Sequence, residues 1–428
     1  MPPDTEALFA SRPDGRTTPD LQGSEFEFVI IGGGAVGCGV AYSLAKAGKT
    51  DVLLIERADD VGEVTTSQGA GLAGQLRATV ERTKLAMHSV QTFRELESRA
   101  EVKPDWNEVG SLRIGLSDEA AAQFGGLRLI ADRCGLECEL IGLDEAKARW
   151  PPMCFDEVKA VLWCPSDGYM LPKSVVRSYR HECQRMGVRF ATGTAVETID
   201  VNGGRVNGVR TNRGEVRCRY VINAAGAHAY HIAMLVGLEL PIVPVRHEYF
   251  VTVALAGLDP QLPCFRIPDL TLYGRVDDSG MLLGGWEATA LATDPRSFSI
   301  ENNAPLIEPD WDVLGSFESK IADLFPSSHG AEKSRVGKGW PTFPPDGKFI
   351  IGESSQVPGF VMAGGCNAHG ISGSGGIGRL LVESLFDESP SEYVTQLSPD
   401  RFTETEWDWR EARVQARRIY ETYYGIES

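Results

Sequence analysis

The chain has 428 residues, 42% of them hydrophobic and 24% charged, and a formal net charge of −17. This composition is ordinary for a globular protein, and the length predicts two or three domains. The negative charge disfavours nucleic acid and anionic membrane surfaces as partners, although a few local Arg or Lys residues can still bind an anionic substrate.

The cysteines and the chain start predict where the protein works. The nine cysteines show no CxxC spacing, so we expect free thiols in a reducing compartment, with no zinc site and no disulfide framework. Residues 1–24 are polar and lack the apolar stretch of a signal peptide, and no apolar run reaches the ~18 residues that span a membrane. The sequence therefore predicts a flexible N-terminal tail (1–24), no membrane contact, no metal and a cytoplasmic location.

The first predicted elements form a β-turn-α-β unit. Residues 26–31 are a run of aromatic and β-branched residues, typical of a buried parallel strand. A glycine-rich turn follows, then a helix over 38–47 that ends at Gly48, and a second buried strand over 51–56. The unit takes about 30 residues, the size of a nucleotide-binding βαβ motif.

Helices and strands are mixed along the rest of the chain. Residues 188–211 alternate as hairpin strands do, with turns predicted at 202–204 and 207–208, and residues 245–300 are rich in strands. The other predicted helices are 83–99, 117–131, 173–186 and 377–386, and the other predicted strands are 109–114, 220–226 and 359–363.

Nucleotide-binding elements at both ends and a strand-rich block between them predict an α/β fold. A discontinuous Rossmann-like domain is expected over 25–105, 155–243 and 335–390. A substrate domain with a mixed, mainly antiparallel β-sheet is expected over 106–154 and 244–334. Residues 391–428 form a predicted C-terminal helical tail that either docks on the chain's own surface or contacts another subunit.

The turn at 32–37 fits the GxGxxG pattern of dinucleotide-binding proteins. Gly32 allows a tight turn, Gly34 lets the backbone approach a pyrophosphate, and Gly37 lets the helix pack against the strand. The N–H groups at the helix start then face the phosphates. Glu56, 19 residues after Gly37, ends the second strand, where a carboxylate accepts hydrogen bonds from ribose hydroxyls. This motif alone does not separate FAD from NAD.

Six further segments occur in an order typical of one family. They are TTSQGAGLAGQLR (65–77), NEVGSLRIG (107–115), SDGYMLP (166–172), PVRHEYFVT (244–252), LYGRVDDSGMLLGGWE (272–287) and WPTFPPDGKFIIGE (340–353). With them, residues 26–390 resemble the D-amino acid oxidase superfamily of flavoproteins, and most of all the FAD domain of dimethylglycine and sarcosine dehydrogenases. The resemblance implies that the discontinuous domain binds FAD and that the substrate is an amine.

The resemblance and the glycine turn together give the candidate FAD contacts. In the family, the glycine-rich loop at 370–376 approaches the flavin ring, and its N–H groups can stabilise negative charge on the reduced flavin. The candidates are Gly32, Gly34, Ala35, Val36, Gly37, Glu56, Arg57, Thr65, Thr66, Ser67, Gln68, Gly71, Ala225, Gly226, Gly365, Gly370, Ser372 and Gly373.

Three departures from the family narrow the expectation. Dimethylglycine-type dehydrogenases have a Trp-His pair, whose His attaches the flavin covalently, where this chain has Ser67 and Gln68; noncovalent FAD is therefore expected. Glycine and D-amino acid oxidases place a carboxylate-binding Arg in the segment matching 339–341, where this chain has none. The folate-binding half of the longer dehydrogenases is also absent, so formaldehyde capture on tetrahydrofolate is not expected from this chain.

Five side chains are candidates for catalysis. His369 precedes the flavin loop and could transfer a proton or orient the amine. His247 and Tyr249 share one strand face, and the Tyr matching Tyr249 lies by the substrate in the similar dehydrogenases; core packing is the alternative. Arg275 or Arg77 could bind a substrate carboxylate, unless Arg275 pairs structurally with Glu248 or Glu287, or Arg77 is a solvated charge. Trp286 and Trp340 could wall the site.

The resemblance implies the oxidation of a small secondary or tertiary amine, such as an N-methylated amino acid. A hydride equivalent would pass to flavin N5 and give an imine that water hydrolyses, with O₂ or an electron-transfer protein as acceptor. Two alternatives stay open: a flavin-dependent 2-hydroxyacid dehydrogenase, and a flavin-carrying subunit of a multi-chain oxidase. The sequence does not fix the substrate or the oligomeric state.

Overall fold

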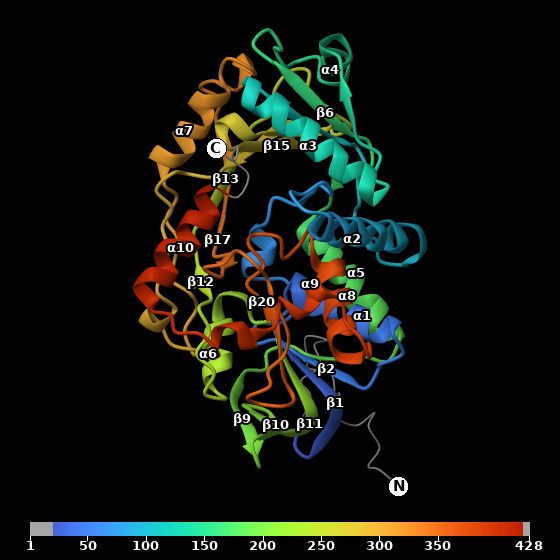
Figure 1. Cartoon of the computed structure of the whole chain (residues 1–428), viewed down its shortest axis with the longest axis vertical. Helices are drawn as coiled ribbons and strands as arrows, with labels where there is room; N and C mark the ends of the chain where they lie inside the picture. Colours follow the sequence, from blue (N-terminus) through green and yellow to red (C-terminus); the bar gives the residue numbers. More distant parts are fainter. Residues whose placement is uncertain (1–19, 423–428) are drawn as a thin grey trace.

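The computed structural model describes residues 20–422 and contains two eight-stranded sheets, one above the other in Figure 1. The first sheet has the order β19-β20-β11-β1-β2-β8, and a β9–β10 hairpin extends it beside β11. Its strands are β1 (Ser24–Ile31), β2 (Val52–Ile55), β8 (Arg189–Ala191), β9 (Val196–Asn202), β10 (Arg205–Thr211), β11 (Gly214–Asn223), β19 (Ile350–Glu353) and β20 (Phe360–Gly364).

The first sheet has a parallel centre made of β8, β2, β1, β11 and β20. Residues of β1 alternate between its two faces, as a strand requires: Phe28 and Ile30 join one core, Val29 and Ile31 the other. Helices cover both faces, which explains why the buried stretches 28–31, 52–55 and 360–363 of these strands are apolar. The helices are α1 (Ala35–Lys46), α2 (Val80–Arg99), α5 (Pro172–Arg185) and α8 (Ser374–Phe386) on one face and α6 (Ala229–Met234) on the other.

The second sheet has the order β17-β13-β16-β15-β14-β4-β6-β5 and is antiparallel except for the β14–β4 pair. Helices α3 (Asp118–Cys134), α4 (Leu143–Arg149) and α7 (Trp311–Ile321) lie with it at the top of Figure 1. Its strands are β4 (Ser111–Gly115), β5 (Glu139–Ile141), β6 (Ala160–Cys164), β13 (His247–Thr252), β14 (Cys264–Ile267), β15 (Leu272–Asp277), β16 (Gly280–Gly285) and β17 (Lys333–Gly339).

Short elements connect the two sheets. Two small ladders pair β3 (Leu72–Ala73) with β7 (Gly168–Tyr169) and β12 (Val243–Pro244) with β18 (Thr342–Phe343). Near the C-terminus, α9 (Glu392–Thr395) lies by the first sheet, and α10 (Trp409–Thr422) packs along β12 and β18 on the left of Figure 1. Among residues 20–422, every helix is too short or too polar to cross a bilayer.

The mixed α/β fold agrees with the sequence-based prediction, but details differ. The predicted turn at 207–208 is wrong: Asn207 and Gly208 lie inside β10, at a register shift, and the chain turns at 212–213 instead. Strand β6 and most of β17 were placed in the Rossmann-like domain, whereas both pair within the second sheet.

The predicted terminal tails lie partly outside the described residues. Residues 1–19 and 423–428 are not described, so the flexible tail over 1–24 is untested for most of its length. Leu21 is buried, and β1 already begins at Ser24.

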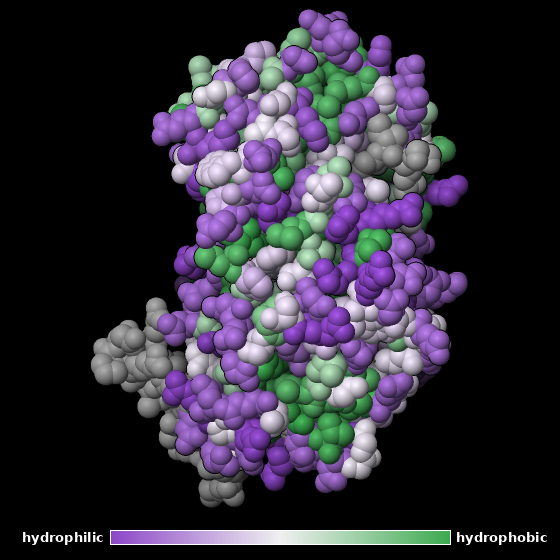
Figure 2. Space-filling view, turned by 90° about the vertical axis from the view of Figure 1, so that its left-hand side faces the viewer, coloured by the Kyte–Doolittle hydropathy of each residue, from purple (hydrophilic) through white to green (hydrophobic). Residues whose placement is uncertain are grey.

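The surface that carries α7 and α10, seen in Figure 2, is mainly hydrophilic with small separate hydrophobic patches.

The N-terminus of α2 allows a simple stability prediction. The Thr79 hydroxyl accepts a hydrogen bond from Arg82 N at 3.2 Å and caps a helix that packs against α8. We expect Thr79→Ala to lower the free energy of unfolding by about 1 kcal/mol, measured by urea denaturation of the flavin-loaded protein. Ser98→Ala, at the exposed last turn of the same helix, is the control and should change it by less than about 0.5 kcal/mol. Equal effects of the two substitutions would contradict the capping role.

Candidate functional site

Two connected cavities lie at the carboxyl ends of the parallel strands, where α/β sheets commonly bind their ligands. The first, which we call the Glu56 cavity, has a volume of about 440 Å³. The second, the His247 cavity, has a volume of about 210 Å³ and lies between the two sheets. Both are lined by Gly34, Thr65, Thr66, Gln68, Ala224, Gly226, Gly339 and Trp340, and they therefore form one continuous hollow.

The backbone geometry of the turn at 32–37 explains why glycine occupies positions 32, 34 and 37. Gly32 has φ +113°, and a Cβ there would lie 2.5 Å from the carbonyl oxygen of Ala224. A Cβ on Gly37 would lie 1.9 Å from the carbonyl oxygen of Gly32, so only glycine lets α1 approach β1 this closely. Gly34 differs, because the nearest atom to its added Cβ would be Thr66 Oγ1 at 3.2 Å. The open side of Gly34 thus faces the hollow, as a phosphate-binding turn requires.

Glu56 follows β2 and lines its cavity. Its two carboxylate oxygens accept hydrogen bonds from Gly33 N at 2.7 Å and Ala58 N at 2.8 Å, which fixes the side chain beside the turn. A carboxylate has about four acceptor positions, so capacity remains for ribose hydroxyls. Arg57 plays a different part: it donates to Ile300 O at 2.8 Å and to Asn303 Oδ1 at 3.1 Å, and so holds the loop that closes this cavity.

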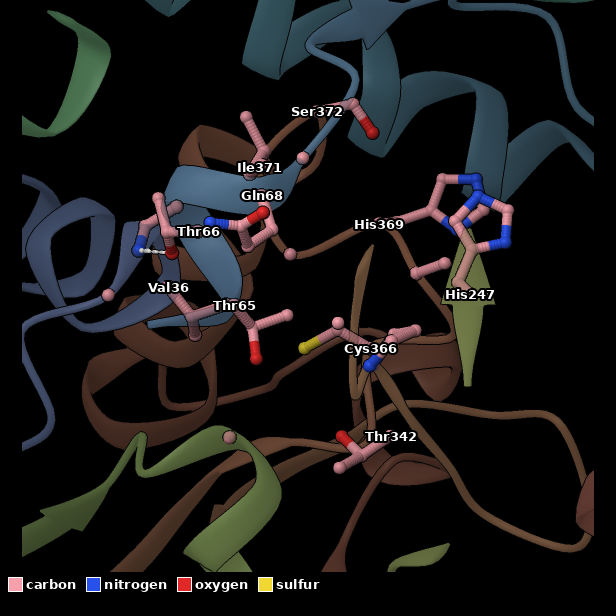
Figure 3. Close-up of a pocket in the computed structure, with 18 of the residues that line it drawn as sticks. Val36, Thr65, Thr66, Gln68, His247, Thr342, Cys366, His369, Ile371 and Ser372 are labelled. Atoms are coloured by element: carbon pink, nitrogen blue, oxygen red, sulfur yellow. Dashed lines mark hydrogen bonds between the residues drawn. The ribbon is translucent and has the colours of Figure 1, made fainter. Parts of the chain in front are cut away.

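Residues 65–68 form a single 3₁₀ turn at the junction of the two cavities. The Thr66 hydroxyl accepts from Ala35 N at 3.1 Å, which ties this turn to the start of α1 (Figure 3). Gln68 lines both cavities. The Ser67 hydroxyl instead donates to Glu63 O at 3.0 Å and to Val64 O at 2.8 Å, and Ser67 lies outside both linings.

Most of the predicted cofactor contacts line the hollow, and four do not. Gly37 and Ser67 serve packing and the local turn, as described above. Gly365 has φ +62°, and an added Cβ would lie 2.5 Å from Pro344 Cγ. Gly373 is the N-cap of α8 and donates to His369 O at 2.8 Å. The predicted contacts that line a cavity are Gly32, Gly34, Ala35, Val36, Glu56, Arg57, Thr65, Thr66, Gln68, Gly71, Ala225, Gly226, Gly370 and Ser372.

Of the glycine-rich stretch 370–376, only residues 370–372 line the His247 cavity. The N–H groups further along are used internally: Ser374 N donates to Ile371 O at 3.1 Å and Gly376 N to Ser89 Oγ at 2.9 Å. We therefore expect only the backbone N–H groups of residues 370–372 to stabilise negative charge on the reduced flavin ring.

His369 is held in the cavity wall by an unusual turn. Asn367 and Ala368 have φ of +46° and +60°, a left-handed conformation that costs energy without glycine. His369 Nδ1 lies 2.6 Å from Asn367 O, so Nδ1 carries the hydrogen and Nε2 is an acceptor in the neutral ring. Burial lowers the pKa of His369, and the positive charge of Arg77 lowers it further. His369 is therefore a neutral imidazole.

His247 lies in the same wall, at the start of β13 (Figure 3). Its Nε2 is 2.8 Å from the Tyr273 hydroxyl and its Nδ1 is 3.0 Å from the Tyr420 hydroxyl. Burial lowers the pKa of His247 to about 4, so this ring is also neutral at physiological pH. The Trp286 ring lies tilted against His247 with ring centroids 5.5 Å apart, and Trp286, Trp340 and Tyr273 give the cavity aromatic walls.

Three of the five catalytic candidates lie outside this cavity. Tyr249 is buried, with its ring against Gly337 and its hydroxyl donating to Gly69 O at 3.3 Å. Arg275 is buried, pairs with Asp277 at 2.8 Å and donates to Ala70 O at 3.0 Å, which disfavours a role in binding substrate. It contacts neither Glu248 nor Glu287; Arg246 pairs with those two. Arg77 lies behind His369 in a small separate cavity.

Arg266 is the charged residue that the sequence analysis missed. Within the described part of the chain, it is the one Arg, Lys, Asp or Glu that lines the His247 cavity. It lies on β14 directly opposite Tyr273 on β15, so these two side chains share one sheet face. An Arg in the apolar strand Cys264–Ile267 carries the same signal that drew attention to Arg275, and it could have been recognised for the same reason.

The hollow suits FAD. A glycine turn open at Gly34 and a carboxylate at Glu56 occupy one end, and an aromatic cavity with two neutral imidazoles occupies the other. Fold and site together define a flavin-dependent oxidoreductase with a small substrate cavity. Residues 27–384 match the family model of the DAO-type FAD dependent oxidoreductases, and the chain belongs to that family.

Relatives and solved structures agree with this assignment. The chain is 27% identical over 387 residues to 4-methylaminobutanoate oxidase (formaldehyde-forming) of Paenarthrobacter nicotinovorans, covering 90% of this chain and 47% of that protein. It is 28% identical over 405 residues to mitochondrial sarcosine dehydrogenase of Mus musculus, covering 93% and 44%. The chain thus spans about half the length of these relatives. The structure of L-proline dehydrogenase from P. horikoshii shares the fold, with a TM-score of 0.79, 23% identity and coverage of 90% and 100%.

The cofactor is FAD, held noncovalently. Gln68 stands where the family resemblance places the His that attaches the flavin, and an amide side chain forms no such bond. Cys366 also lines the cavity, but burial raises the pKa of its thiol to about 12 and keeps it protonated and unreactive. We expect acid precipitation to release all flavin into the supernatant and to leave a colourless pellet. A yellow pellet would contradict this, and peptide mapping would then locate the bond.

Proposed function

We propose that this chain uses FAD to oxidise a small N-methylated amino acid, a secondary or tertiary amine with a carboxylate. One observation carries the proposal: among the described residues, Arg266 is the one charged side chain that lines the His247 cavity, and this cavity continues into the glycine-turn hollow. A substrate with one carboxylate and one amine matches this charge pattern.

The residues of the His247 cavity would have separate roles in binding and oxidation of the substrate. Arg266 would bind the carboxylate by charge-assisted hydrogen bonds and fix the distance from carboxylate to amine. Tyr273, directly opposite, and His247 would contact the nitrogen. Trp286 and Trp340 would exclude water. Bound FAD would accept a hydride equivalent from the carbon next to the nitrogen, and water would hydrolyse the resulting imine.

The named substrates of the relatives support this class. 4-Methylaminobutanoate oxidase and sarcosine dehydrogenase both carry the name of an N-methylated amino acid, and they match at least 90% of this chain. The two names differ in the distance from carboxylate to nitrogen, so the position of Arg266 is expected to select among such substrates.

Anaerobic reduction of the purified yellow protein tests the proposal. The panel contains N-methylglycine, N,N-dimethylglycine, 4-methylaminobutanoate and 2-hydroxyglutarate. We expect at least one of the amines to bleach the flavin and to release formaldehyde if the methyl carbon is oxidised. Bleaching by 2-hydroxyglutarate alone would replace the proposal with hydroxyacid oxidation, and no bleaching until another chain is added would replace it with a subunit role.

The electron acceptor, the cellular location and the oligomeric state are part of the same proposal. We expect O₂ or an electron-transfer protein to reoxidise the flavin, which air and an artificial dye acceptor distinguish after bleaching. A cytoplasmic location and oligomer formation stay predictions. Hydrodynamic mass of the flavin-loaded protein tests the second.

A further inference from the structure

A row of hydrogen bonds leads from the His247 cavity into the interior beneath α10. Tyr273 and His247 line the cavity, with 2.8 Å between the Tyr273 hydroxyl and His247 Nε2. His247 Nδ1 is 3.0 Å from the Tyr420 hydroxyl, which donates to Glu287 Oε2 at 2.6 Å. Tyr420 is completely buried and Glu287 is 7% exposed, and neither lines the cavity. The row thus joins the substrate space to a buried carboxylate.

The hydrogen bonds in this row run in one direction. An ionised carboxylate only accepts hydrogen bonds, so the Tyr420 hydroxyl donates its hydrogen to Glu287. The Tyr420 oxygen can then only accept a hydrogen bond from His247. His247 Nδ1 therefore carries the hydrogen, and Nε2 of the neutral ring accepts from Tyr273. The Tyr273 oxygen, whose hydrogen goes to His247, has acceptor positions that can take a hydrogen bond from a donor in the cavity, such as the N–H of a substrate ammonium.

The charges around Glu287 favour the uptake of a proton. Arg246 is 3.5 Å from Glu287, but it also pairs with Asp310 at 2.8 Å and with Glu248 at 3.5 Å. One guanidinium thus faces three carboxylates. Lys320 on α7 also interacts electrostatically with Glu287. Burial raises the pKa of Glu287 by more than the hydrogen bond from Tyr420 and the charge of Arg246 lower it.

We propose that Glu287 receives the proton that a substrate ammonium loses before oxidation, by way of Tyr273, His247 and Tyr420. The substrate N–H bond breaks and a Tyr273 O–H bond forms. The Tyr273 hydrogen moves to His247 Nε2, the Nδ1 hydrogen to Tyr420, and the Tyr420 hydrogen to Glu287. The net change is one proton from nitrogen to carboxylate, with no electron moved. This inference rests on the proposed function, because an amine supplies the proton.

In this relay, α10 contributes a residue to the site. An ammonium has no lone pair to release, so the neutral amine is the reactive form. Tyr420 reaches the cavity histidine from 173 residues further along the chain, orients its ring and passes the proton on to Glu287. The expected docking of the C-terminal helix on the chain's own surface therefore also completes the active site.

Glu287→Gln is the main test, because the amide oxygen still accepts from Tyr420 while the side chain no longer takes up a proton. Stopped-flow flavin reduction by the best amine of the panel is followed from pH 6 to pH 10. We expect the rate constant of the variant to fall about tenfold or more at pH 7 and to recover at high pH, where the amine is already neutral. Glu421→Gln, which removes a neighbouring α10 carboxylate bonded to Ala290 N, is the control and should keep the wild-type profile.

A second measurement needs no turnover. In ¹⁵N-histidine-labelled, flavin-loaded protein, His247 is expected to be the Nδ1–H tautomer, and Tyr420→Phe is expected to shift it toward the Nε2–H form. An Nε2–H tautomer in the wild type, or a wild-type pH profile in Glu287→Gln, would overturn the relay alone. If no amine bleaches the wild type, the proposed function fails, and the relay fails with it for lack of a proton source.

Discussion

Gly34→Val abolishes tight FAD binding without unfolding the protein: this is the largest effect we expect from a single substitution. Gly34 has φ −74° and ψ −177°, an extended conformation that valine adopts readily. An added Cβ would meet only Thr66 Oγ1 at 3.2 Å, so the fold can absorb it by a small shift of one side chain. The branched methyl groups would instead occupy the space that the pyrophosphate needs.

The expected loss is at least about 100-fold in FAD affinity, equivalent to about 2.7 kcal/mol. It is measured by fluorescence titration of the flavin-free protein. Circular dichroism and thermal unfolding of that protein show whether the fold is kept. Gly142→Val is the matched control, because Gly142 also has an extended conformation and an added Cβ there meets no atom within 4 Å. Tight FAD binding by Gly34→Val would refute the assignment of this turn to the phosphates.

Arg266→Met is expected to lower kcat/KM for an N-methylated amino acid by about 100-fold. The lost charge-assisted hydrogen bonds are worth about 2–3 kcal/mol, and each 1.4 kcal/mol is a factor of ten. An N-methylated amine without a carboxylate should react equally well with both proteins, because Arg266 would not contact it. The ratio of the two substrates therefore isolates the carboxylate contact from general damage to the site.

Two other arginines serve as controls for this experiment. Arg113 on β4 is the register partner of Arg266 on the neighbouring strand, and it lies outside the His247 cavity. Arg113→Met should leave the substrate ratio unchanged. Arg275→Met should lower stability, because it breaks the buried pair with Asp277, but leave KM unchanged. If Arg275→Met raised KM while Arg266→Met did not, the carboxylate site would have to be moved to Arg275.

Two of the catalytic candidates that lie outside the His247 cavity do so for the same geometric reason. Tyr249 and Arg275 each lie two residues beyond a residue that lines the cavity, His247 and Tyr273 respectively. Residues two apart share a strand face but stand ~7 Å apart along it. The alternation of the strand therefore correctly put Tyr249 on the same face as His247. It could not say how far along each strand the cavity extends.

Local patterns in the sequence determined the nucleotide half of the site. The turn at 32–37, the strand before it, the helix after it and Glu56 are adjacent in the chain, and their geometry follows from short-range backbone sterics and helix-end hydrogen bonding. Position 68 is likewise Gln and not His, and this was enough to predict noncovalent attachment of the flavin from the sequence. Such features need no information about distant segments.

Only the tertiary structure decided the substrate half. Arg266 faces the cavity because β14 pairs with β15 in a register that sets it opposite Tyr273, and His247 is oriented by Tyr420 from a helix near the end of the chain. Sheet order, strand register and helix docking depend on the packing of the whole chain, since many arrangements bury the same apolar residues locally. A sequence pattern therefore indicates that an arginine in a strand needs a partner, and the fold alone determines which one it meets.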